Sequence, residues 1–66
     1  MKHLLEYMYK TVKVKTIDGR ELKGEVVDYE NAIENDLECD EIGIDYKTHI
    51  EVVGENEIKN IEIISE

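Results

Sequence analysis

The sequence predicts a mainly β fold in one domain over residues 1–66: a short N-terminal helix followed by a five-stranded, strongly bent antiparallel small barrel. Three observations predict it. The chain has 66 residues, which allow one small domain and no second core. Apolar and polar residues alternate with a period of two over short stretches, as in half-buried strands. Turn residues separate these stretches, and such a run of short strands is typical of a barrel or a sandwich.

The first residues, about 2–9, have the pattern of a short amphipathic helix. Leu4, Leu5 and Met8 fall at helical spacing, with Tyr9 alongside. So short a helix is not stable alone in water. We therefore expect it to dock on the rest of the fold through Leu5, Met8 and Tyr9.

Two strands, about 11–17 and 21–30, are predicted to form a hairpin. Asp18-Gly19 between them is a strong turn signal, because glycine supplies the positive φ that a tight turn requires. Gly24 inside the second strand indicates a bend or a close backbone approach. The adjacent Val26 and Val27 break the alternation, which indicates a bulge that turns Tyr29 inward.

Three shorter strands complete the predicted sheet, over about 41–46, 49–53 and 58–64. The turns between them fall at Lys47-Thr48 and Gly54-Glu55-Asn56. The segment from Asn31 to Glu41 is predicted to be a loop. Its most prominent feature is a set of five carboxylates, which we call the acidic loop: Glu34, Asp36, Glu38, Asp40 and Glu41.

The charge of the chain excludes some classes of function. There are 17 acids against 8 bases, a formal net charge of −9. A strongly basic nucleic-acid module and an anionic membrane surface as partner are therefore not expected. No apolar run approaches the roughly 20 residues of a membrane span, and the first residues lack the pattern of a signal peptide. Because the single Cys39 cannot form an internal disulfide, we expect a cytoplasmic location.

The charge is also uneven along the chain. Residues 1–24 hold six bases and three acids, whereas residues 25–66 hold two bases and fourteen acids. Lys13, Lys15 and Lys23 are predicted to form a stripe on neighbouring strands, either as a basic patch or in cross-strand pairs with Glu21 and Glu25. The four tyrosines either stack on bases or fill the rim of the core.

The acidic loop permits three interpretations: a cation site, an acidic surface that docks a basic partner, or a solvated mobile loop. Its spacing does not follow the calcium-binding EF-hand loop, and His3, His49 and Cys39 lack zinc spacing. No arrangement of nucleophile and base is present. We therefore expect no metal, no cofactor and no enzymatic activity.

The order of elements resembles the Sm-like (LSm) family over nearly the whole chain. The segment Val12-Lys-Val-Lys-Thr-Ile-Asp-Gly-Arg-Glu-Leu-Lys-Gly24, followed by Tyr29-Glu30, is similar to the family's first motif. Its second motif is similar to Ile50–Val53, Gly54 and Ile58–Ile63. The segment from Tyr29 to Ile42 looks closest to small uncharacterised Sm-like proteins of Gram-positive bacteria and their phages. The resemblance implies a single Sm-like domain.

The resemblance also implies a candidate site for single-stranded RNA. In RNA-binding relatives a base is held by an aromatic-acid-Asn set and an Arg-Gly pair. The matching residues here are Tyr29, Glu30, Asn35 and Gly54, with Asn35 one position late. Val53 stands where the arginine would be, and it lacks the planar stacking group and fixed donors of arginine.

Self-assembly is the main expectation for function. A barrel of this size, with no disulfide or metal, gains little net stability alone, and oligomerisation is the remaining support. Sm-like proteins, by resemblance, pair the fourth strand of one subunit with the fifth of the next, which implies a homo-oligomeric ring of about five to seven subunits. The expected ligand is single-stranded RNA; the alternatives are an acidic protein-interaction or inhibitor module that mimics nucleic acid and binds a basic protein, or a nucleotide-binding sponge at subunit interfaces. The predicted interface residues are Ile50, Val52, Val53, Ile58, Ile61 and Ile63.

Overall fold

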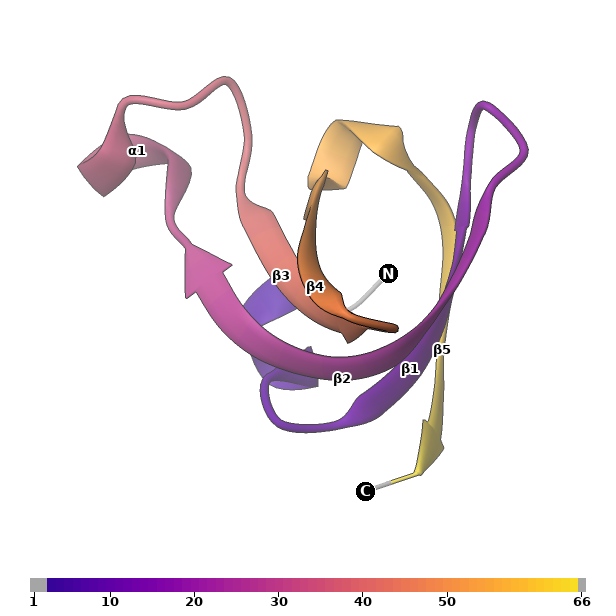
Figure 1. Ribbon diagram of the computed structural model, residues 1–66. Coiled ribbons are helices and arrows are strands. Elements are labelled where there is room, and N and C mark those ends of the chain that lie inside the picture. The colour runs from indigo at the N-terminus through magenta and orange to yellow at the C-terminus, as the bar shows by residue number, and fades with distance from the viewer. Residues whose placement is uncertain (1–2, 66) are drawn as a thin grey trace.

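The computed structural model describes residues 3–65 of the chain, as five strands with three very short helical segments (Figure 1). In chain order the elements are the 3₁₀ helix η1 (Leu4–Tyr7), β1 (Thr11–Thr16), β2 (Glu21–Glu30), α1 (Ala32–Asn35), β3 (Glu41–Tyr46), β4 (His49–Gly54), the 3₁₀ helix η2 (Glu55–Glu57) and β5 (Ile58–Ser65). Each strand begins and ends within one residue of its predicted bounds.

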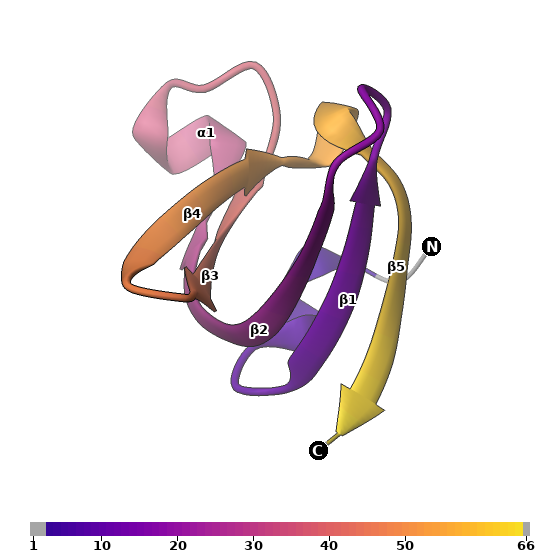
Figure 2. The same ribbon diagram turned by 45° about the vertical axis from the view of Figure 1, so that its right-hand side comes forward.

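The five strands form one antiparallel sheet in the order β4-β3-β2-β1-β5. The mainly β, five-stranded prediction is therefore confirmed. The sheet curves strongly, but β4 and β5 remain its two edges, and among residues 3–65 no ladder joins them. Figure 2 shows these edge strands on opposite sides of the curved sheet. The sheet of one chain is thus open, not a closed barrel.

Side chains and single backbone bonds, in place of a ladder, join the β1–β2 turn to β4 and to η2. Arg20, in the β1–β2 turn, places Nη1 3.3 Å from Oε2 of Glu51 on β4. The backbone N–H of Ile17 in the same turn donates to the carbonyl of Glu57 in η2 at 2.9 Å. These contacts hold the hairpin over the β4–β5 connection without satisfying the free edges.

The bend lies in β2, as the sequence predicts. Residues 21–25 of β2 pair with β1, and residues 25–30 pair with β3. At Gly24 a Cβ atom would lie 2.1 Å from the backbone oxygen of Asp45, so only glycine fits this close approach. A register shift between Val26 and Asp28 places a bulge at Val27, and Tyr29 turns inward to pack against the core.

The core fills the concave side of the sheet. Its buried side chains come from η1 and from all five strands: Leu4, Tyr7, Val12, Val14, Leu22, Val26, Ile42, Ile44, Val53 and Ile58.

The N-terminal helix is shorter than predicted, and of its three predicted anchors Met8 alone packs against the core. Lys2 lies outside the described residues, and η1 ends at Tyr7. Leu4 and Tyr7 are buried, Met8 is half-buried, and the predicted anchors Leu5 and Tyr9 are exposed. The reason is the 3₁₀ geometry, in which residues three apart lie on the same face. The prediction assumed α-helical spacing, which was wrong.

The predicted loop after β2 contains one turn of α-helix. The Asn31 side chain caps α1 by accepting from the N–H groups of Ile33 at 2.9 Å and Glu34 at 3.2 Å. Asp36 ends the turn in the left-handed conformation, with φ 55°. No helix within residues 3–65 has the length and apolarity to cross a membrane.

Replacing Gly24 with alanine should destabilise the fold, because the added methyl group collides with the backbone of β3. We expect the free energy of unfolding to fall by roughly 1–3 kcal/mol, as for overpacked sites. Urea denaturation measures the loss. The control is Lys23→Ala, at the neighbouring exposed position, which should change the free energy of unfolding by less than about 0.5 kcal/mol. Equal effects of the two substitutions would show that the close approach at Gly24 does not require glycine.

Candidate functional site

Asp40 fixes the acidic loop against the end of β2. Its Oδ1 accepts from the backbone N–H of Ala32 at 2.9 Å, and its Oδ2 accepts from the hydroxyl of Tyr29 at 2.9 Å. The Ala32 N–H and then the Tyr29 hydroxyl lower the pKa of Asp40 below its ordinary value. Asp40 is therefore a structural member of the acidic loop, turned toward the fold.

His3 joins the N-terminus to the same point. Its Nδ1 accepts from the backbone N–H of Leu5 at 3.2 Å, and its Nε2 lies 3.5 Å from Oδ2 of Asp40. The imidazole ring is also 5.7 Å from the Tyr29 ring, centroid to centroid. Because His3 and Asp40 are far apart in sequence, no local pattern indicated this contact.

The four residues of the predicted RNA site lie at one end of the sheet but line no common hollow. Glu30 and Asn35 line one hollow, of about 350 Å³, and Gly54 lines a second, of about 460 Å³. The hydroxyl of Tyr29 is bonded to Asp40, and its ring lies against His3. Val53, at the position of the missing arginine, is fully buried in the core.

The first hollow, which we call the outer hollow, lies on the convex side of the sheet beside β4. Asp28, Glu30 and Glu41 surround it, Gly43 and Val52 contribute apolar surface, and its lining within residues 3–65 includes no Lys or Arg. Glu30 and Glu41 are direct cross-strand neighbours. Asp28 is the main cause of a raised pKa at Glu30, with burial and Glu41 adding to it. Three carboxylates thus lie close together at this hollow although they repel one another.

The second hollow, the loop hollow, lies between the acidic loop and η2. Its ionisable lining consists of carboxylates and one thiol: Asp36, Glu38, Cys39, Glu41 and Glu57. Of the remaining predicted loop acids, Glu34 is exposed on α1. Within the described part of the chain, no three His, Cys, Asp or Glu side chains are placed to hold a metal ion.

The lysine stripe lies on the convex face of β1 and β2, at the other end of the sheet. Lys13 and Lys23 are direct cross-strand neighbours, and Lys15 stands opposite Glu21. Lys59 of β5 and Lys15 line a shared hollow. Among residues 3–65, none of these four lysines forms an ion pair, so the cross-strand pairs with Glu21 and Glu25 are not made.

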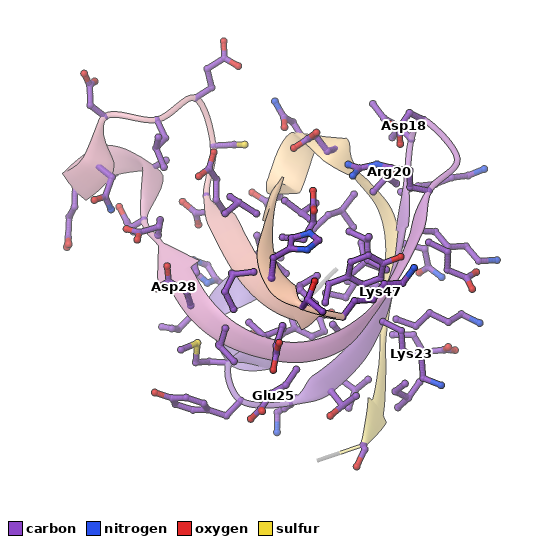
Figure 3. All side chains as sticks on the ribbon, viewed as in Figure 1. Asp18, Arg20, Lys23, Glu25, Asp28 and Lys47 are labelled. Carbon is purple, nitrogen blue, oxygen red and sulfur yellow. The ribbon has the colours of Figure 1, made fainter. Side chains whose placement is uncertain are left out.

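The charge is therefore distributed unevenly over the folded molecule as well as along the sequence. Along β2 the outward side chains change from Lys23 to Glu25 to Asp28 as the strand passes from β1 to β3 (Figure 3). The bend in β2 separates the part of the convex face that carries the lysine stripe, where Glu21 and Glu62 also lie, from the acidic part beside the β4 edge.

The two edges of the sheet carry the exposed apolar side chains of the strands. On β4, Ile50 is 50% exposed and Val52 is 55% exposed; on β5, Ile64 is 41% exposed. Ile61 and Ile63 are partly buried against the core. Val53 and Ile58, which the sequence placed at the interface, are core residues, so their side chains are not available on the surface. Parity explains this, because both alternate toward the concave face.

No family model, curated protein or solved structure matches the chain.

Replacing Asp40 with asparagine should loosen the acidic loop and change the acid response. Because folding lowers the pKa of Asp40, the unfolded chain binds more protons at this group. The stabilisation is complete well above the ordinary pKa of about 3.9 and is lost as the pH falls through the lowered value.

Asp40→Asn should therefore lower the melting temperature at pH 7 and flatten the loss of stability below about pH 4. Thermal unfolding followed by circular dichroism over a pH series measures both. Asp36→Asn is the matched control, since Asp36 is exposed in the same loop and should have little effect. Indistinguishable pH profiles for the two variants would contradict the anchoring role of Asp40.

Proposed function

We propose that this protein is a non-enzymatic, Sm-like binding module that assembles into a homo-oligomeric ring of about five to seven copies. The observation that carries the proposal is the pair of unpaired sheet edges, β4 and β5, in one open sheet. Among residues 3–65 no strand pairs with the outer side of either edge, and exposed apolar side chains lie there, Ile50 and Val52 on β4 and Ile64 on β5. Such edges are templates for pairing with another strand.

The size of the chain supports the same proposal. At 66 residues a single core gives little net stability, and small folds ordinarily add disulfides, metals or subunit contacts. The only cysteine, Cys39, is free. Burial of Ile50 and Val52 against another copy would remove half-exposed apolar side chains from water, at about 25 cal/mol for each Å² covered.

The two edges differ in sequence, which determines the kind of assembly. If β4 of one copy pairs with β5 of the next, each contact uses two different surfaces. Contacts of this head-to-tail kind close into a ring when the rotation between copies allows it. Closure of the small barrel then takes place between copies, in place of closure within one chain.

The ligand that the hollows favour is a cationic segment of a protein. Carboxylates line both the outer hollow and the loop hollow, and in the described part of the chain neither lining includes a Lys or Arg. Phosphate groups would be repelled there, whereas lysine or arginine side chains would be attracted. One observation supports single-stranded RNA as the ligand instead, namely the unpaired lysines of the stripe. Lysines of this kind contact phosphates without sequence preference.

The assembly is tested by placing lysines on the β4 edge. The double variant Ile50→Lys/Val52→Lys keeps the buried core intact, because both side chains are about half exposed. We expect the wild-type protein to be oligomeric at micromolar concentration in light scattering after size exclusion, and the variant to be a folded monomer.

The matched control is Ile17→Lys/Ile33→Lys, which adds the same charge at two exposed isoleucines outside β4 and β5. It should leave the oligomer unchanged. A wild-type protein that runs as a folded 7.7 kDa monomer would overturn the proposal.

The ligand is tested by comparing labelled oligolysine with labelled poly-uridine and poly-adenosine in fluorescence anisotropy. We expect oligolysine to bind at low salt, with an affinity that falls as salt is added, and the RNAs to bind at least tenfold more weakly (about 1.4 kcal/mol). Glu30→Gln/Glu41→Gln should weaken oligolysine binding. Tighter binding of RNA than of oligolysine would contradict a cationic protein ligand and would favour a nucleic acid.

A further inference from the structure

A third hollow, beside the β1–β2 turn, is lined mainly by basic side chains. Its volume is about 260 Å³, and its walls come from β1, the turn, β2 and β5. Figures 1 and 2 both show the start of β5 next to this turn. We call it the basic hollow, and its lining consists of Lys15, Thr16, Gly19, Arg20, Glu21 and Lys59.

A β-bulge in β5 brings the two lysines of this hollow together. Thr16 pairs with Ile58 and Lys15 pairs with Asn60, so the register shifts between these pairs and Lys59 is the extra residue. Two residues of β5, Lys59 and Asn60, therefore lie opposite Lys15. Thr16 and Ile58 point into the core, whereas Lys15 and Lys59 are exposed at the hollow.

Backbone bonds hold the walls of the basic hollow in place. The N–H of Gly19 donates to the carbonyl of Thr16 at 3.1 Å and closes the turn. The N–H of Ile17 donates to the carbonyl of Glu57 at 2.9 Å, and Glu57 directly precedes β5. The second bond ties the start of β5 to the turn, so the two lysines keep their relative position without a ligand.

Two of the three basic groups have charge available for a ligand. Arg20 is already paired, with Nε 3.3 Å from Oδ2 of Asp18 and Nη1 3.3 Å from Oε2 of Glu51 (Figure 3). Within residues 3–65, neither Lys15 nor Lys59 forms an ion pair. Two ammonium groups on neighbouring strands repel each other, and an anion between them would remove this repulsion. The hollow therefore favours a ligand with more than one negative charge.

Carboxylates on the same convex face restrict the shape of that ligand. Glu21 lines the hollow and is the cross-strand neighbour of Lys15. Farther along the face, Glu62 stands opposite Lys13, and Glu25 lies beyond them. A linear polyanion laid along the lysine stripe would pass all three carboxylates, whereas a compact anion in the hollow meets Glu21 alone. The charges thus favour a compact anion over a nucleic-acid strand.

We propose that the basic hollow binds a phosphomonoester group between the ammonium groups of Lys15 and Lys59. Such a group carries about 1.5 to 2 negative charges at pH 7 and three acceptor oxygens. These features match two lysines, each of which has one charge and three rotatable donors. Arg20 forms the wall beside the turn, and Glu21 lowers the affinity by repelling the ligand. The inference goes beyond the proposed assembly, because every group in the site belongs to one chain.

Binding is measured by adding inorganic phosphate to ¹⁵N-labelled protein at low salt and pH 7 and following the amide chemical shifts by NMR. We expect saturable shifts confined to the amides around the basic hollow, with an affinity that falls as sodium chloride is added. Lys59→Gln should raise the dissociation constant by about tenfold or more, because a charge-assisted hydrogen bond is lost. Lys13→Gln is the matched control, since it removes the same charge from the lysine stripe outside the hollow. It should raise the dissociation constant by less than about threefold.

A second pair of variants should act in the opposite direction. Glu21→Gln removes the carboxylate from the lining and should tighten phosphate binding by about threefold or more. Glu62→Gln raises the net charge equally on the same face but outside the hollow. It should leave the dissociation constant within about twofold of the wild-type value.

Two further ligands, adenosine 5′-monophosphate and O-phosphoserine, identify the carrier of the phosphate. Equal affinities for these ligands and inorganic phosphate would support a site that recognises the phosphate alone, and tighter binding of one would support the site and name its carrier. The site would be overturned by the absence of saturable shifts with all three ligands, or by equal effects within either pair of variants. Tighter binding of an oligouridine without a terminal phosphate would also overturn it. None of these outcomes bears on the proposed self-assembly, which has its own test.

Discussion

The whole sheet depends on one strand, β2, which pairs with β1 through its first half and with β3 through its second. The strand can serve both neighbours only because it bends where Gly24 meets the backbone oxygen of Asp45, at a distance that no side chain permits. The bend turns a row of five strands into a curved sheet with a single core. It also leaves β4 and β5 at opposite ends of the row, each with one free edge.

The same bend determines where the acidic and basic residues lie on the sheet. Bases gather in the part of the chain that forms β1 and the start of β2, and acids gather in the part that forms the end of β2, the acidic loop and β3. Because β2 turns between these parts, the two charges occupy different ends of the sheet. A protein with a net charge of −9 thus keeps a local group of lysines, which lies on the convex face of β1 and β2.

Much of the fold could be predicted from the sequence, because period-two alternation and the Asp18-Gly19 turn act locally. The anchors of η1 could not, since Leu4 and Tyr7 replace Leu5 and Tyr9 only once the helix takes 3₁₀ geometry. The contacts of Asp40 with Tyr29 and His3 join segments that are distant in the chain, so no spacing in the sequence indicates them. The burial of Val53 and Ile58 follows from which face of each strand the bend turns inward.

Pairing of the free edges between copies can be observed most directly by amide hydrogen exchange, measured by NMR at two protein concentrations on either side of the association midpoint. If β4 and β5 pair between copies, their outward amides exchange more slowly at the higher concentration, whereas the amides in the β1–β2 and β2–β3 ladders keep one rate. If the outward amides of both edges exchange equally fast at the two concentrations, no strand of another copy covers them, and the proposed assembly is wrong.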